Sequence, residues 1–300
     1  MNRTIHYTIE EIHHNLTILQ FLKSKNYTDK AIISLKKREN GILKNNKWSY
    51  VNERLSTNDI LTIHIIEDEV SKHILPIYFP LDVVYEDEDI IILNKPSDMP
   101  IHPSQNNYDN TLANALAYYF KSQDKSFVFR CVNRLDRNTT GLTLLAKHQL
   151  AGGILSNMVA KREIKRTYLA ICSDDGSLPF SGTIDMPISR LDGSTIERVV
   201  DAENGETAIT HFTKEKFLAH KNLSLIKLNL ETGRTHQIRV HMKYINHPLI
   251  GDGLYNPEFT HINRQALHSY SLEFIHPITL APMYFTCDLP SDMKNCLDFS

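Results

Sequence analysis

The pattern of apolar and polar residues changes from helical spacing to alternation within about the first 70 residues. Leucines three residues apart predict a helix with one buried face: Leu16, Leu19 and Leu22. Thr28 is placed to cap a second helix, which Gly41 would end. The buried face of that helix is expected to carry Ala31, Ile32 and Leu35. Alternating apolar residues then indicate one short strand: Leu61, Ile63 and Ile65.

Beyond residue 75 strand and helix patterns alternate without the regular spacing of a doubly wound fold. Strands are predicted at 90–93, 142–146, 207–217 and 223–230, and helices at 112–119 and 150–158. The last two strands are neighbours along the chain and are expected to pair antiparallel. The sequence therefore predicts an α+β fold. Residues 76–300 would form a domain on a mixed, largely antiparallel sheet, and residues 1–75 a small α+β module in front of it.

Composition bears on where the protein is located in the cell and says little about its chemistry. The chain has 300 residues, of which 41% are apolar and 23% charged. It has no apolar run of the roughly 18 residues that a membrane span needs. Glu10 and Glu11 stand where a signal peptide would be apolar, and the four cysteines form no Cys-x-x-Cys pair. We therefore expect a cytoplasmic monomer with reduced cysteines and no contact with a membrane.

Charge is separated along the chain although the net charge is only −2. Residues 23–54 hold nine Lys or Arg against three Asp or Glu, and residues 130–170 hold eight against two. Between them, residues 67–89 hold one against eight. Two basic regions on either side of an acidic segment are compatible with a polyanionic partner, and equally with solvated surface helices.

The first basic region carries its cations on the predicted second helix: Lys30, Lys36, Lys37 and Arg38. Residues 35–38, 41–42 and 58–61 resemble the small αL RNA-binding module of some ribosomal proteins and RNA-modifying enzymes. The resemblance implies that these cations bind RNA. In place of the usual Asn-Gly-Lys turn this chain has Asn45-Asn46-Lys47, and Asn tolerates the positive φ that such a turn needs. A helical cap on the larger domain is the alternative.

The second basic region contains one acid between two arginines, Arg134 and Arg137, just before an apolar strand. A nearby guanidinium favours the charged form of a carboxylate, and an ionised, desolvated carboxylate is a usable nucleophile. Asp136 is therefore a candidate for chemistry. A structural ion pair between aspartate and arginine is the alternative.

A second polar segment, residues 231–241, follows the strand predicted at 223–230. Thr235 is placed to cap a helix, with Arg234 at its entrance and Arg239 in its second turn, where they could hold a carboxylate or a phosphate. His236 and His241 are five residues apart, unlike the four-residue spacing of a zinc-binding pair. We predict no metal site.

The third segment, residues 161–170, combines cations with one aromatic ring. Lys165 and Arg166 are candidates for contacts with phosphates, and Tyr168 could stack on an unstacked base. A core tyrosine is the alternative. From the residues alone, the three segments indicate an RNA-binding protein that could be an enzyme.

The three segments, in this order, resemble the RluA-type family of RNA pseudouridine synthases. The resemblance also includes residues 93–96, 101–103, 247–252 and 266–268, and so covers roughly residues 80–290. It implies that Asp136 is the essential carboxylate, Tyr168 the ring against the target base and Arg239 the partner of Asp136. It further implies substrate contacts from Arg134, Arg137, Lys165, Arg166, Arg234 and His236. The chain departs from the pattern at Asn133, where His is more frequent, and at Thr140, where Ser is common.

The reaction that the resemblance implies is the isomerisation of uridine to pseudouridine within structured ribosomal or transfer RNA, with no cofactor. The base must leave its stack and enter a pocket, which suits a stacking tyrosine. Asp136 would attack the sugar or promote elimination to a glycal, and the sequence does not choose. A catalytically silent RNA-binding protein and a metal-dependent hydrolase are the competing classes. An assay of uridine conversion and a chelator would separate these classes.

Overall fold

The computed structural model describes residues 2–67, 69–71, 73–258 and 262–298. Residues 2–67, which we call the N-terminal unit, form a four-stranded sheet in the order β1-β4-β2-β3 with two helices. Its elements are β1 (Asn2–Thr8), α1 (Ile18–Ser24), α2 (Asp29–Lys36), β2 (Ile42–Lys44), β3 (Lys47–Trp48) and β4 (Ile60–Ile66). Asn45 and Asn46 turn between β2 and β3 with φ of 51° and 63°, so asparagine fills the left-handed positions as expected.

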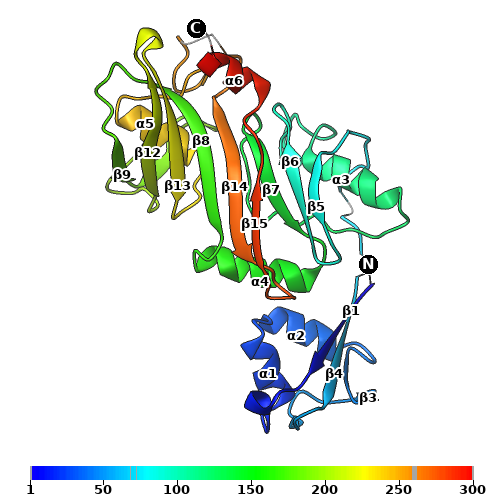
Figure 1. The fold of residues 1–300 in the computed structure, drawn as a ribbon. Helices are drawn as coiled ribbons and strands as arrows, with labels where there is room; N and C mark the ends of the chain where they lie inside the picture. Colours follow the sequence, from blue (N-terminus) through cyan, green and yellow to red (C-terminus); the bar gives the residue numbers. More distant parts are fainter. Residues whose placement is uncertain (1, 68, 72, 259–261, 299–300) are drawn as a thin grey trace.

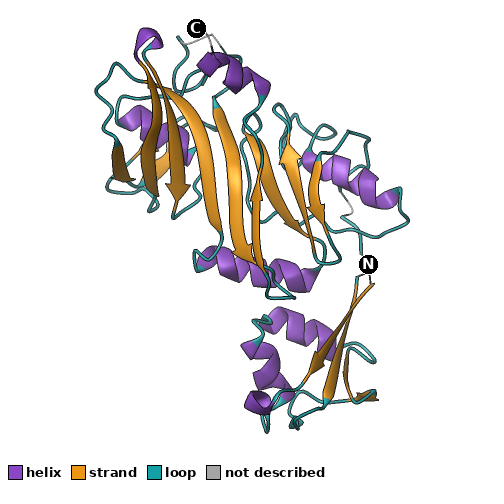
Figure 2. Cartoon of the chain, viewed as in Figure 1, coloured by secondary structure: helices purple, strands orange, loops and turns teal. Residues whose placement is uncertain are grey.

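The rest of the chain is built on one curved nine-stranded sheet in the order β5-β6-β7-β14-β8-β13-β12-β9, with β15 paired to β14 (Figure 2). Its strands are β5 (Val83–Glu86), β6 (Ile90–Lys95), β7 (Thr140–Ala146), β8 (Lys165–Ser173), β9 (Ser181–Asp185), β12 (Ile209–Leu218), β13 (Leu223–Leu230), β14 (Leu267–Ile275) and β15 (Pro282–Thr286). Among the strands of the described residues, only β7 and β14 pair parallel. The predicted α+β fold with a mixed, largely antiparallel sheet is confirmed.

The helices of this part lie around the sheet (Figure 1). They are α3 (Leu112–Lys121), α4 (Gln149–Ala160), α5 (Gln237–Tyr244) and α6 (Ser291–Asp298). A separate two-stranded ribbon consists of β10 (Ile188–Arg190) and β11 (Arg198–Val200). Every helix within the described ranges is too short or too polar to cross a bilayer.

Helix α4 lies between the main sheet and the N-terminal unit (Figure 1). One hydrophobic cluster runs through all three and includes Ile18, Leu35, Leu150, Ile154, Ile92 and Phe274. At the contact, a Cβ on Gly153 would lie 3.0 Å from the Thr28 side chain, so a glycine inside α4 lets α2 approach closely. The division near residue 75 remains a prediction, because the two parts share a core.

The predicted first helix has a different buried face. Thr17 and Gln20 form a capping box that starts α1 at Ile18, so Leu16 precedes the helix and Leu19 is 39% exposed. Ile18 and Phe21 are buried instead of these two, whereas Leu22 is buried as predicted. The second helix has the predicted face and Thr28 cap, but it ends at Lys36, well before Gly41.

Candidate active site

The three predicted catalytic residues and most of the predicted substrate contacts line an open cavity of about 530 Å³. Its walls come from the loop between Cys131 and Thr139, the end of α4, the start of β8, the turn after β13 and the start of α5. Arginines line much of it: Arg134, Arg162, Arg166, Arg234 and Arg239. A larger cavity of about 1010 Å³ borders the same loop at Asn138, and among the described residues none of the predicted site residues lines it.

The loop that carries Asp136 is held by buried polar contacts. The Asn133 side chain is 2% exposed; it accepts a hydrogen bond from the Leu144 amide at 2.7 Å and donates one to the Leu142 carbonyl at 3.0 Å. Asn133, where His is more frequent in the family pattern, thus bonds to the backbone of β7 through both its acceptor and its donor. After the loop, Gly141 has φ of 106°, and a Cβ there would lie 2.3 Å from the Ser269 carbonyl oxygen.

Thr140, the second departure from the family pattern, keeps a hydroxyl contact. Its Oγ1 lies 2.8 Å from Nδ1 of the buried His268, at the point where β7 and β14 pair. The loop is therefore anchored at both ends, by Asn133 before Asp136 and by Thr140 after it.

A buried lysine, Lys95, holds the loop that carries Asp136 through hydrogen bonds to backbone carbonyls. The side chain is 1% exposed, and its Nζ donates to the carbonyls of Pro96, Met99 and Arg137 at 2.7, 3.0 and 2.9 Å. Burial lowers the pKa of Lys95 to about 7, against the attraction of the nearby Asp136 charge. The contact with the Arg137 carbonyl ties β6 to the residue next to Asp136.

Asp136 forms an ion pair with Arg239, 103 residues further along the chain. Nη1 of Arg239 lies 3.2 Å from Oδ2 of Asp136, whose side chain is 25% exposed. Burial opposes the charge on Arg239, but hydrogen bonds and charges from Asp252 and Asp136 outweigh it, so the pKa of Arg239 lies above its usual value. A carboxylate that faces a cavity beside a fixed cation is suited to nucleophilic chemistry.

Tyr168 lies beside this pair in β8 and lines the cavity while only 4% exposed. Burial raises the pKa of its phenol, although the Arg166 charge opposes the shift, so the ring stays neutral. A neutral aromatic ring at a cavity wall is a surface on which a base can stack.

The turn before α5 differs from the prediction. Thr235 does not cap the helix, because His236 occupies the N-cap position with φ of 58° and α5 starts at Gln237. His236 makes no capping hydrogen bond through its side chain, and the Gln237 side chain accepts a hydrogen bond from the Arg234 amide ahead of the helix at 3.0 Å. Arg239 consequently lies in the first turn of α5, not the second.

His236 lines the cavity and contacts a tyrosine that the sequence did not single out. Its Nδ1 lies 3.0 Å from the Tyr255 hydroxyl. Burial lowers the pKa of His236, the nearby Asp136 charge opposes that shift, and the Arg239 charge adds to it. The imidazole is therefore neutral near pH 7 and can exchange hydrogen bonds with a substrate.

Two of the predicted substrate contacts lie away from the cavity. Lys165 pairs with Glu273 at 2.9 Å, and Arg137 pairs with Asp98 at 2.7 Å, in both cases on the surface. Neither side chain lines the cavity, whereas Arg134, Arg166, Arg234 and His236 do. Arg162, which lines the cavity and pairs with Glu231, was missed, although it belongs to the same basic segment.

Lys30 and Lys36 lie on α2 and are exposed; after the helix, Lys37 is exposed and Arg38 is half-buried. Lys30 lines a small cavity together with Cys131 and Val132, two residues that also line the candidate active site. The basic helix of the N-terminal unit therefore lies next to the arginine-lined cavity.

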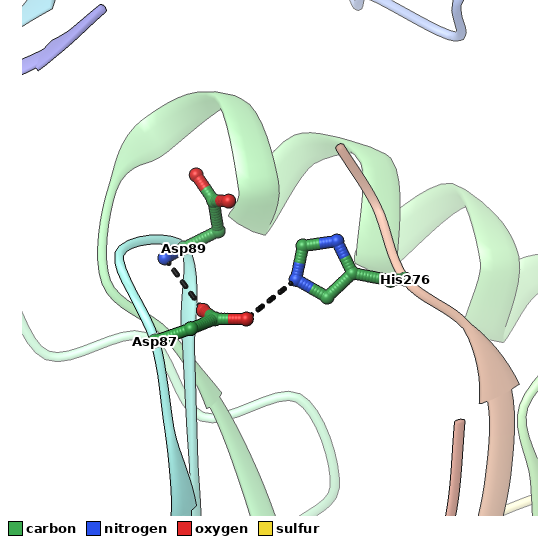
Figure 3. A group of neighbouring side chains, drawn as sticks. All are labelled: Asp87, Asp89 and His276. Carbon is green, nitrogen blue, oxygen red and sulfur yellow. Dashed lines mark hydrogen bonds and ion pairs between the residues drawn. The ribbon is translucent and has the colours of Figure 1, made fainter. Parts of the chain in front are cut away.

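Asp87, Asp89 and His276, none of which lines the cavity, form one further cluster with ligand-type atoms (Figure 3). His276 Nε2 lies 2.9 Å from Oδ2 of Asp87, and the Asp89 and Ile90 amides donate to its Oδ1 at 2.8 Å. The Asp89 carboxylate binds Arg3 in a bidentate pair. Protein donors thus already occupy these oxygens, and the cluster serves to join β1, β6 and the end of β14.

A carboxylate paired with an arginine, beside a buried tyrosine in an arginine-lined cavity, defines an enzyme that acts on a polyanion. Comparison with known proteins makes the class specific. The model of the family described as RNA pseudouridylate synthase matches residues 89–244. The chain belongs to this family, in its RluA-type branch, and is an RNA pseudouridine synthase, an isomerase.

Related sequences and a solved structure support the same family. The chain is 40% identical to the Bacillus subtilis RNA pseudouridine synthase YhcT over 84% of this chain and 83% of that protein. It is also 40% identical to ribosomal large subunit pseudouridine synthase D of Escherichia coli, over 73% and 70%. The structure of human RNA pseudouridylate synthase domain containing 1 is similar with a TM-score of 0.60 and 25% identity, covering 72% of this chain and 87% of that one.

Proposed function

We propose that this enzyme isomerises uridine in structured ribosomal or transfer RNA, with Asp136 as the nucleophile. The observation that carries the proposal is the contact between Asp136 and Arg239 at the cavity, next to Tyr168. Because one similar protein is named a ribosomal large subunit pseudouridine synthase, ribosomal RNA is the first substrate to test. A ribosomal substrate would place the enzyme in the cytoplasm.

The proposed reaction exchanges one bond to the sugar for another. The bond from the ribose C1′ to N1 of uracil breaks, the freed uracil turns, and a bond forms from C1′ to C5. The proton on C5 is lost and N1 gains one, so no cofactor is consumed. Asp136 would act either by attack on C1′ or by assisting removal of the sugar's 2′ proton to give a glycal.

The cavity suits a base that has left the RNA stack. Its volume of about 530 Å³ lies within the usual range for ligand sites. Tyr168 would pack against the flipped uracil, Arg134 would help to displace it, and Arg166, Arg234 and His236 would hold the flanking phosphates and sugars.

The experiment that tests this function is pseudouridine mapping of total RNA from cells with and without the gene. We expect at least one uridine, in large-subunit ribosomal RNA first, to lose its modification in the deletion strain and regain it when the gene is restored. A strain in which every pseudouridine persists would contradict the proposal, provided that the purified protein also modifies no ribosomal or transfer RNA transcript.

The N-terminal unit is proposed to bind RNA through α2 and its C-terminal end, because Lys30, Lys36 and Lys37 are exposed there and Lys30 lines a small cavity that adjoins the active site. Replacing Lys36 and Lys37 by Gln should weaken RNA binding and flatten its salt dependence. The expected loss in the logarithmic salt slope is about 1.4 to 1.8, for two phosphate contacts. RNA binding would be measured across a salt series.

The matched control replaces Lys121 and Lys125, two exposed lysines at the end of α3, by Gln. This control removes the same charge from a different surface and should leave the slope unchanged. Equal slopes for the two double variants would show that α2 does not contact phosphates.

A further inference from the structure

The guanidinium of Arg239 lies between two carboxylates that hold it unequally. Asp252 accepts hydrogen bonds from Nε and Nη2 at 2.7 Å each, whereas Asp136 accepts one from Nη1 at 3.2 Å. Bidentate pairs of this kind are the stronger and more directional ones. The orientation of Arg239 is therefore set by Asp252 and not by Asp136.

Asp252 is itself fixed in place. It is fully buried, and its Oδ1 also accepts hydrogen bonds from the backbone amides of Leu254 and Tyr255 at 3.1 and 3.2 Å. The Tyr255 ring supports the face of the guanidinium, with its centroid 4.9 Å from Cζ of Arg239. One short turn, residues 252–255, thus holds the arginine by one edge and one face.

We propose that Asp252 is a positioning residue for the reaction: by occupying one edge of the Arg239 guanidinium, it limits that arginine to a single hydrogen bond with Asp136. The second oxygen of Asp136 is then left for the sugar of the flipped nucleotide. An unrestrained arginine would instead turn its fork to Asp136 and occupy both oxygens. This inference rests on the proposed role of Asp136 as the nucleophile.

The shared cation also affects the charge on Asp136. The charged and titratable groups that face Asp136 from the packed elements are Lys95, Tyr168, His236 and Arg239. Arg134 and Arg137 flank it within its own loop. If Asp252 loses its charge, the positive charge of Arg239 acts on Asp136 alone and stabilises its ionised form further. Activity that requires this ionised form should then persist to lower pH.

The test uses full-length Asp252→Asn in single-turnover assays on a transcript of the RNA site identified by pseudouridine mapping. We expect a rate about a hundredfold below wild type, because a small displacement of a positioned group has effects of this size. RNA affinity should change by less than about twofold. The acid limb of the rate against pH should move to lower pH.

Asp252→Glu separates position from charge. It keeps the negative charge but lengthens the side chain by one methylene, which shifts the guanidinium towards Asp136. We expect a reduced rate with the acid limb at its wild-type position. This variant also keeps the test decisive if Asp252→Asn does not fold, because an unchanged rate for Asp252→Glu would overturn the proposal.

Asp174 offers a closely matched control. It is also buried, accepts backbone hydrogen bonds from Gly176 and Leu178, and pairs with Lys214 at 2.7 Å, but it does not line the cavity. Asp174→Asn should lower the melting temperature and leave both the rate per folded molecule and the pH profile unchanged. If Asp252→Asn behaves in the same way, Asp252 is only structural and the proposal is wrong.

Failure of this inference can be told apart from failure of the proposed function. If Asp136→Asn is inactive while Asp252→Asn turns over normally with an unmoved acid limb, Asp136 keeps its role and only the inference about Asp252 falls. If Asp136→Asn itself retains turnover, Asp136 is not the nucleophile. The proposed function of the site is then wrong, and the inference about Asp252, which depends on it, is wrong as well.

Discussion

Asp136→Asn is expected to reduce pseudouridine formation by about a thousandfold or more, while the fold and RNA binding persist. The amide has nearly the same shape as the carboxylate, but it lacks the negative charge and is a poor nucleophile and base. Asp136 is 25% exposed and accepts a single hydrogen bond from Arg239. Losing its charge should therefore alter the free energy of unfolding by only about 1 kcal/mol.

The measurement is pseudouridine formed per mole of folded variant in a single turnover, together with a melting curve and RNA affinity. Asp98→Asn is the matched control, because Asp98 pairs with Arg137 of the same loop but lies on the surface. It should turn over like wild type. Turnover of Asp136→Asn within about tenfold of wild type would reject the nucleophile, since such a difference is only about 1.4 kcal/mol in activation free energy.

Local pattern was enough for those elements that follow one physical rule each, but it did not predict several strands, among them β1, β5, β9, β14 and β15. Alternation identified β4 and β13, and short apolar runs identified β6 and β7. It failed at α1, where a polar capping box and not the leucine spacing decides which residue starts the helix.

The same rules explain which predicted site residues lie at the cavity. Lys165 and Arg166 are neighbours in β8, and successive side chains of a strand point to opposite faces. Arg166 and Tyr168, two residues apart, both line the cavity, whereas Lys165 faces Glu273. Alternation along β8 could have excluded Lys165 from the sequence alone.

The contacts around Arg239 could not be predicted from local sequence patterns. Asp136 is 103 residues away and Asp252 is 13 residues away in an irregular turn. No periodicity connects loops to one another, because their positions depend on how the strands that carry them are ordered in the sheet. The resemblance to a family predicted the pair of Asp136 with Arg239 and included Asp252 in the segment 247–252. Only the three-dimensional arrangement showed that Asp252 and Tyr255 contact Arg239.

Arg239→Met is expected to lower the rate per folded molecule by about a hundredfold to a thousandfold, the usual effect of removing one preorganised charged donor. It should also destabilise the protein, because it leaves Asp252 buried without its cation, at a cost of about 3 to 5 kcal/mol. The variant alone would therefore mix two effects. A second substitution that restores stability is therefore needed before the rate of the variant can be interpreted.

Arg239→Met combined with Asp252→Asn removes the unpaired buried charge and should recover much of the lost stability, as melting curves would show. Its turnover should stay as low as that of Arg239→Met, because the partner of Asp136 is still missing. Arg239→Lys should be intermediate, since a single ammonium cannot satisfy Asp252 at two points and Asp136 at a third. If the stabilised double variant instead turns over at nearly the wild-type rate, another cation at the cavity must hold Asp136, with Arg234 the first to examine.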